Sequence, residues 1–223
     1  MLRICLIAYV ALLCGCGKPE TPAPRPAAQG AAPATAPASP PAAADGRRTI
    51  VCFGDSITAG FGLDSGQSFP DLLQQDLVHY RVVNLGVSGD TTQDGLARVS
   101  LALAEKPAIV LLELGGNDGL RGIPLSITQA NLAQMIEALQ GAGARVVLAG
   151  MSLPPNYGAA FIGKFEAMYK SLSARYKLTL IPFLLEGVGG HDDLMQRDGI
   201  HPNAAGARKV EALVMKALAP LLK

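Results

Sequence analysis

The sequence contains no tryptophan and few aromatic or charged residues, at 5% and 17% of the chain. The net charge is +1 and no run of Lys or Arg is present, so the electrostatic footprint of a nucleic-acid-binding protein is missing. Three of the four cysteines lie within the first sixteen residues, and Cys52 alone lies beyond them, which excludes a disulfide-rich fold. What is present is apolar: hydrophobic residues make up 49% of 223, enough for one globular domain with additional sequence.

The N-terminus has the pattern of a secretory signal. Arg3 precedes about ten apolar residues that end at Leu13, a stretch too short to span a hydrocarbon core of ~30 Å comfortably. Residues 13–16, Leu-Cys-Gly-Cys, resemble a bacterial lipobox. The resemblance implies that residues 1–16 form a lipoprotein signal peptide and lipobox. Cys16 then becomes the lipidated first residue, on the periplasmic side of a bacterial membrane and by our expectation the outer membrane. The alternative is an ordinary cleaved signal peptide with a coincidental cysteine.

Residues 17–47 are rich in proline and alanine and show no apolar periodicity. Such a segment buries too little apolar surface to fold, and its prolines keep it extended. We therefore expect a disordered tether between the membrane anchor and a folded domain at residues 48–223. A proline-rich ligand for a partner protein is the alternative for this segment.

Beyond the tether, short β-rich runs alternate with stretches of helical spacing. The expected strands are residues 49–53, 81–85, 108–114, 144–149 and 178–181. The expected helices are residues 68–79, 91–104, 127–139, 161–176 and 203–222. This alternation predicts a three-layer α/β/α sandwich around a five-stranded, mostly parallel sheet of the flavodoxin-like type. Ligands bind such sheets beyond the carboxyl ends of the strands, so the loops at those ends are the candidate site.

Four loops at these positions each carry a residue suited to acyl transfer. They are residues 54–58, 86–90, 115–118 and 198–202. Acyl transfer needs a nucleophile, a general base, a group that orients the base, and donors for the oxyanion. We assign Ser56 as nucleophile, His201 as base and Asp198 as the orienting residue. The backbone N–H groups of Ser56 and Gly89 and the side chain of Asn117 are the expected oxyanion donors.

These loops resemble the four sequence blocks of the SGNH (GDSL) hydrolase family, and the match runs from Ile50 to the C-terminus. The resemblance is to bacterial acyl-CoA thioesterase/lysophospholipase enzymes and arylesterases. It extends to VNLGVSGDTT, LELGGNDGLRG and PNYG at residues 83–92, 112–122 and 155–158. By this resemblance the family's serine, glycine, asparagine, aspartate and histidine fall on Ser56, Gly89, Asn117, Asp198 and His201.

The resemblance implies a serine hydrolase that needs no metal or organic cofactor. Its substrates would be carboxylic esters or thioesters, namely lysophospholipids, acyl thioesters or aryl esters. An apolar acyl groove is expected along residues 119–124 and 153–162, the first of which is either a mobile lid or a rigid surface loop. The expected substrate-binding residues are Gly119, Leu120, Ile123, Pro155, Asn156 and Tyr157. The membrane is the expected partner through lipidated Cys16, nucleic acid is not, and the oligomeric state is left open.

Three other interpretations compete with this one. A carbohydrate O-deacetylase or acetyltransferase acting on envelope polysaccharide would need the same nucleophile and base. A non-catalytic lipid-binding lipoprotein would not need Ser56, Asp198 and His201 together. The loop from His191 to Asp193 offers metal ligands, but its spacing matches no helical zinc motif.

Overall fold

The computed structural model describes residues 46–222. The expected signal peptide, Cys16 and almost all of the expected tether therefore lie outside the described residues. Within residues 46–222, no helix has both the length and the apolar character needed to cross a membrane.

One five-stranded sheet forms the centre of the domain. Its strands are β1 (Arg48–Gly54), β2 (Tyr80–Gly86), β3 (Ile109–Glu113), β4 (Arg145–Ala149) and β5 (Thr179–Ile181). They lie in the order β2-β1-β3-β4-β5, and every pair of neighbours is parallel. The central strand β3 is buried along its whole length, which explains its apolar run from Ile109 to Leu112. The prediction of a flavodoxin-like parallel sheet is confirmed.

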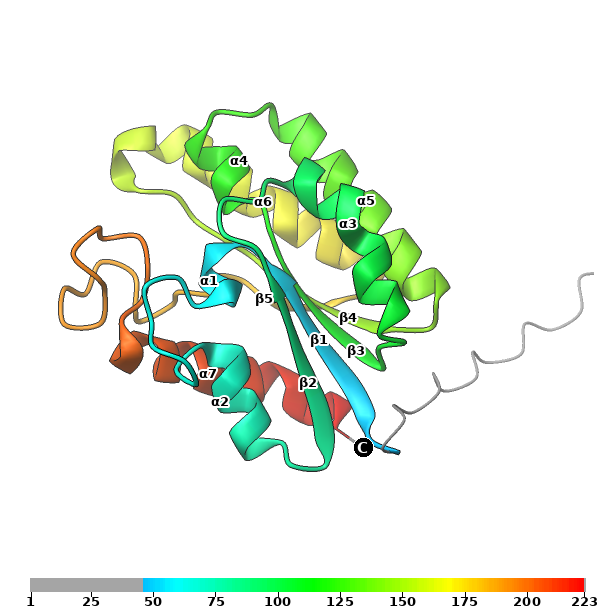
Figure 1. Ribbon diagram of the computed structural model, residues 1–223. Coiled ribbons are helices and arrows are strands. Elements are labelled where there is room, and N and C mark those ends of the chain that lie inside the picture. Colours follow the sequence, from blue (N-terminus) through cyan, green and yellow to red (C-terminus); the bar gives the residue numbers. More distant parts are fainter. Residues whose placement is uncertain (1–45, 223) are drawn as a thin grey trace, which may run out of the picture. The chain divides into compact units, whose positions relative to one another are not determined.

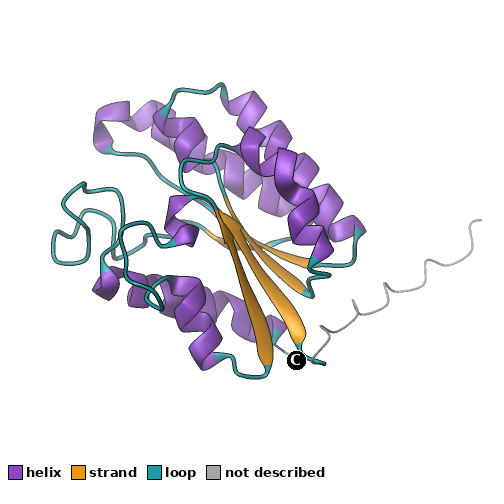
Figure 2. Cartoon of the chain, viewed as in Figure 1, coloured by secondary structure: helices purple, strands orange, loops and turns teal. Residues whose placement is uncertain are grey.

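Helices cover both faces of this sheet. They are α1 (Ser56–Ala59), α2 (Phe69–Asp76), α3 (Thr92–Ala104), α4 (Gly116–Leu120), α5 (Leu125–Gly141), α6 (Ala159–Tyr176) and α7 (Ala204–Leu218). Helices α3, α5 and α6 lie on one face, and α2 and α7 lie together on the other (Figure 1). Figure 2 shows the resulting three layers of helix, sheet and helix. Two 3₁₀ turns, η1 (Pro155–Tyr157) and η2 (Ala219–Leu221), complete the regular structure.

Two segments expected as loops are short helices. α1 begins at Ser56 because the Asp55 side chain accepts a hydrogen bond from the N–H of Ile57, and it ends at Gly60 in the left-handed conformation. α4 follows Gly115, whose φ of 113° a residue with a Cβ rarely adopts. The last helix is also shorter than expected, since Pro220 lies in η2 and cannot donate to a continuing α-helix.

One carboxyl group is enclosed in the core of the sheet. Glu113 ends β3 and is fully buried, and its Oε2 accepts hydrogen bonds from the N–H of Asp55 at 3.2 Å and the Thr58 hydroxyl at 2.8 Å. Burial, followed by the charge of Asp55, raises the pKa of Glu113 well above its ordinary value. A Cβ on Gly54 would lie 2.4 Å from Glu113 Oε2, so glycine is required beside this carboxyl group.

Glu113→Gln should become progressively more stable relative to the wild type as the pH rises. The folded protein holds the Glu113 proton above the ordinary pKa of a glutamate, whereas the unfolded chain releases it. The wild type should therefore lose stability as the pH rises above the ordinary pKa of a glutamate, about 4.3, a loss that the amide avoids. Urea unfolding at several pH values measures this difference, with Glu186→Gln at an exposed position as the control. A difference in unfolding free energy that does not change with pH would contradict a protonated Glu113.

Candidate active site

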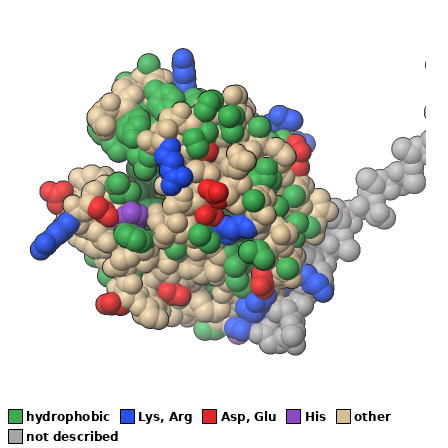
Figure 3. All heavy atoms as spheres, turned by 45° about the horizontal axis from the view of Figure 1, so that its top comes forward, with side chains coloured by type: hydrophobic (Ala, Val, Ile, Leu, Met, Phe, Trp, Pro, Cys, Tyr) green, Lys and Arg blue, Asp and Glu red, His purple; other side chains and the backbone are tan. Residues whose placement is uncertain are grey.

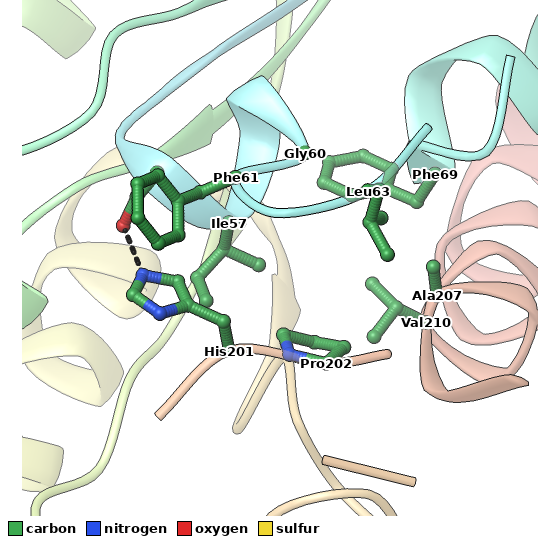
Figure 4. A pocket seen from close by; sticks show the side chains of 10 residues that line it. Ile57, Gly60, Phe61, Leu63, Phe69, His201, Pro202, Ala207 and Val210 are labelled. Atoms are coloured by element: carbon green, nitrogen blue, oxygen red, sulfur yellow. Dashed lines mark hydrogen bonds between the residues drawn. The ribbon is translucent and has the colours of Figure 1, made fainter. Parts of the chain in front are cut away.

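The structure brings Ser56, His201 and Asp198 into one hydrogen-bonded chain. Ser56 is the first residue of α1, immediately after β1, whereas Asp198 and His201 lie in the loop before α7. The Ser56 hydroxyl lies 2.9 Å from His201 Nε2, the contact dashed in Figure 4. On the other side of the ring, His201 Nδ1 lies 2.7 Å from Asp198 Oδ2. With the imidazole proton on Nδ1, the hydroxyl donates to the ring and the ring donates to the carboxylate. This is the geometry of an activated serine nucleophile.

The loop around Asp198 keeps its carboxylate ionised and directed at the imidazole. Asp198 Oδ1 accepts hydrogen bonds from the N–H groups of Ile200 at 2.9 Å and His201 at 3.0 Å, which leaves Oδ2 for the ring. Partial burial acts to raise the pKa of Asp198, but the hydrogen bonds from His201 and Ile200 lower it to about 2. Gly199, with a φ of 68°, makes the tight turn between these residues. Asp198 is therefore a permanent negative charge at neutral pH.

Asp55 shapes the turn that presents the nucleophile. Its Oδ1 accepts the Ile57 N–H at 3.0 Å, so this carboxylate binds the backbone next to Ser56. Burial raises the pKa of Asp55 to about 6, against the lowering effects of the Ile57 N–H, the Glu113 side chain and the nearby His201. Asp55 and Glu113 together thus form a buried acidic support beneath the serine.

The expected oxyanion donors face the same cavity as Ser56. Gly89 follows β2, and Asn117 lies in α4. The N–H of Ser56 lies in the first turn of a helix, so it has no intrahelical acceptor. Asn117 Nδ2 donates to Asp55 Oδ2 at 3.0 Å and to the backbone oxygen of Asp90 at 2.9 Å. Both hydrogens of this amide are already used, so it must share or release one bond to reach an oxyanion.

Sequence reasoning missed two charged residues that support the site, the half-buried Arg98 and the buried Glu113. Arg98 donates to the backbone oxygens of Gly54 and Leu85, both at 2.8 Å, and pairs with Asp90, so it joins the ends of β1 and β2. Its position inside an amphipathic helix carries no signal of this role. Glu113 does carry a signal, because it is an acid within the apolar run of residues 108–114.

A cavity of about 700 Å³ opens over the triad. Ser56, Gly89, Asn117 and His201 all line it. Most of the remaining wall is apolar and consists of Leu120, Met151, Leu153, Pro154, Pro155, Phe183, Leu185, Met195 and Ile200. Figure 3 shows this face hollowed beside a histidine, with hydrophobic side chains gathered around the hollow.

The predicted substrate-binding residues are only partly at this cavity. Leu120 and Pro155 line it, but Gly119, Ile123, Asn156 and Tyr157 are not among its lining residues. Gly119 is buried against the Leu153 side chain, and the Tyr157 hydroxyl turns away to donate to the backbone oxygen of Leu120 at 2.9 Å. The second wall, from residues 183–195, was not expected.

The loop that contains His191 is exposed. Among residues 46–222, no group of three or more His, Cys, Asp or Glu side chains is arranged to hold a metal ion.

Comparisons with known proteins agree with this geometry. Residues 52–209 match the model of the GDSL-like lipase/acylhydrolase family. The chain is 48% identical over 180 residues to Esterase TesA of Pseudomonas aeruginosa, covering 78% of this chain and 90% of that protein. It is 39% identical over 176 residues to Thioesterase 1/protease 1/lysophospholipase L1 of Escherichia coli, covering 78% of this chain and 85% of that protein.

Solved structures show the same relationship. A crystal structure of TesA is similar with a TM-score of 0.76 at 48% identity, covering 78% of this chain and 100% of that one. The crystal structure of the esterase EstA from Pseudoalteromonas, inhibited by monoethylphosphonate, is similar with a TM-score of 0.74 at 31% identity. The match covers 78% of this chain and 98% of that one. The resemblance to SGNH hydrolases is thereby confirmed. The chain belongs to the GDSL-like lipase/acylhydrolase family of ester-hydrolysing enzymes.

Proposed function

We propose that this chain hydrolyses acyl esters and thioesters through a covalent intermediate on Ser56. The observation that carries the proposal is the hydrogen-bonded chain from Ser56 through His201 to Asp198 at the floor of an apolar cavity. His201 Nε2 takes the hydroxyl proton while Ser56 Oγ attacks the carbonyl carbon, and the ionised Asp198 stabilises the imidazolium that forms. The same proton then goes to the departing alcohol or thiol, and a water molecule activated by His201 releases the acid.

The negative oxygen of the tetrahedral intermediate would receive three donors. These are the backbone N–H groups of Ser56 and Gly89 and the amide of Asn117. Asn117 is held against Asp55 and Asp90 in the structure, so its amide is already oriented before substrate binds. The amide therefore needs no search for its position, but it must share or release one of these two bonds to donate to the oxygen.

The cavity supports substrates with an apolar acyl chain. Its volume and apolar walls suit lysophospholipids, acyl thioesters and aryl esters. The first two classes agree with the name of the Escherichia coli relative, and aryl esters agree with that of the Arylesterase of Vibrio mimicus. Acetylated polysaccharide fits less well, because a sugar chain would leave polar groups against apolar walls.

Ser56→Ala should lower kcat for p-nitrophenyl esters at least about 10³-fold, because the nucleophile is lost while the fold is retained. Steady-state assays with p-nitrophenyl butyrate, octanoate and palmitate measure this loss, and chain-length dependence in the wild type tests the apolar cavity. Ser88→Ala is a matched control, since Ser88 lines the same cavity outside the triad. A fluorophosphonate should add mass at Ser56 alone. More than a tenth of wild-type activity in Ser56→Ala would refute the assignment.

Asn117→Ala should lower kcat by about 10²–10³-fold with little change in KM, because its amide acts on charge that develops in the transition state. Asn156→Ala is the control, since this exposed asparagine does not line the cavity. The measurement is the full steady-state rate curve for both variants. An effect on KM alone would show that Asn117 binds ground-state substrate and is no oxyanion donor.

We also propose that the chain is exported and anchored through acylated Cys16, as the lipobox-like residues 13–16 suggest. Cys16→Ser should abolish incorporation of labelled palmitate and shift the protein from the membrane to the soluble fraction, because each buried CH₂ contributes about 0.8 kcal/mol to membrane binding. Cys14→Ser, two residues earlier, should keep the label. Label retained in Cys16→Ser would leave a plain signal peptide as the explanation.

A further inference from the structure

Gln196 bridges the segment that follows the nucleophile and the segment that carries the base. Its side-chain nitrogen donates to the backbone oxygen of Phe61 at 2.7 Å and to that of Pro202 at 2.9 Å. Its backbone N–H donates to the backbone oxygen of His201 at 2.7 Å. The two amide hydrogens of one side chain therefore join two loop segments that are far apart in the sequence.

The backbone on both sides is shaped around this amide. In the segment that carries His201, Met195 pairs with Pro202 in an antiparallel bridge. The N–H of Gly199 donates to the backbone oxygen of Gln196 at 3.0 Å. On the serine side, a Cβ on Gly62 would lie 2.2 Å from Gln196 Oε1, and the φ of Gly62 is 75°. The close approach of these segments depends on glycine at residue 62 and a long amide at residue 196.

Phe61, whose carbonyl accepts from Gln196, contacts both Ser56 and His201. The N–H of Phe61 donates to the backbone oxygen of Ser56 at 3.0 Å, so the carbonyl that Gln196 holds belongs to a residue bonded to the nucleophile. The Phe61 ring packs on the imidazole of His201, with centroids 4.7 Å apart, on the side where the ring accepts the serine bond (Figure 4). A shift of either segment would move Phe61, Ser56 and His201 relative to one another.

We propose that Gln196 is a positioning residue, which holds His201 in register with Ser56 by donating to the Phe61 and Pro202 carbonyl groups. This inference rests on the proposed roles of Ser56 and His201. The base must reach the hydroxyl over 2.9 Å although 145 residues separate the two, and a displacement of about 1 Å costs about 10²-fold in rate. Gln196 touches no reacting atom, so its effect should fall on kcat and not on substrate binding.

Gln196→Met tests this inference, because methionine has a similar length and no N–H donor. We expect kcat for p-nitrophenyl butyrate to fall by about 10- to 100-fold with KM changed less than about threefold. The rate of Ser56 modification by a fluorophosphonate should fall by a similar factor, since it depends on the same proton transfer. Gln196→Asn keeps the donors on a shorter side chain, and we expect an intermediate loss. It also serves as the second variant should the methionine variant fail to fold.

The matched control is Gln140→Met. Gln140 also donates from its side chain to a distant carbonyl, that of Tyr176 at 3.1 Å, but it joins α5 to the end of α6 away from the site. It should lose a similar amount of stability in urea unfolding and keep its kcat. Equal kcat values for Gln196→Met, Gln140→Met and the wild type would overturn the positioning role. Ser56→Ala and His201→Ala in the same assay test the proposed function separately: if both remain active, that function fails, whatever Gln196 does.

Discussion

The hydrogen bond between Ser56 and His201 joins two segments that come from opposite ends of the domain's sequence. Ser56 is placed from the sheet, because it follows β1 and lies above buried Glu113, which binds the turn at Asp55 and Thr58. His201 is placed by the loop between β5 and the start of α7. Parallel strands end at one edge of the sheet, so this topology brings such loops together, but it does not by itself set a distance within tenths of an ångström. That precision comes from polar contacts between loops.

These polar contacts form a buried network at the carboxyl edge of the sheet. Arg98 joins the ends of β1 and β2, and Asn117 joins the next segment to Asp55 and Asp90. In a low-dielectric interior such bonds are strong when complete and costly when broken, so they hold the loops rigidly. The network would oppose one step of the proposed mechanism. The amide of Asn117 is held by two acceptors with which an oxyanion would compete, and Asp55, with its pKa raised to about 6, is one of them.

The sequence predicted the sheet, and it pointed to the residues that the structure brings together as Ser56, His201 and Asp198, because both leave local patterns. The central strand is an apolar run, and Ser56, Asn117 and His201 each lie where a strand ends or the last helix begins. The helices α1 and α4 were missed because four or five residues are too few for an apolar periodicity. The second cavity wall was missed because residues 183–195 have neither helical nor strand spacing. Arg98 and Gln196 act through partners far away in the sequence, and no local pattern reports such contacts.

The same loop contributes to substrate binding and to the alignment of the base. Met195 lines the cavity, Gln196 follows it and bonds to both backbone segments, and Asp198 and His201 complete the loop. An acyl chain that packs against Met195 therefore contacts the residue next to the bridge. Because Met195 is also paired with Pro202, movement of this wall is resisted by the backbone that carries His201. The apolar cavity and His201 are thus joined through one loop. In the proposed mechanism this joins binding of the acyl chain to the geometry of proton transfer.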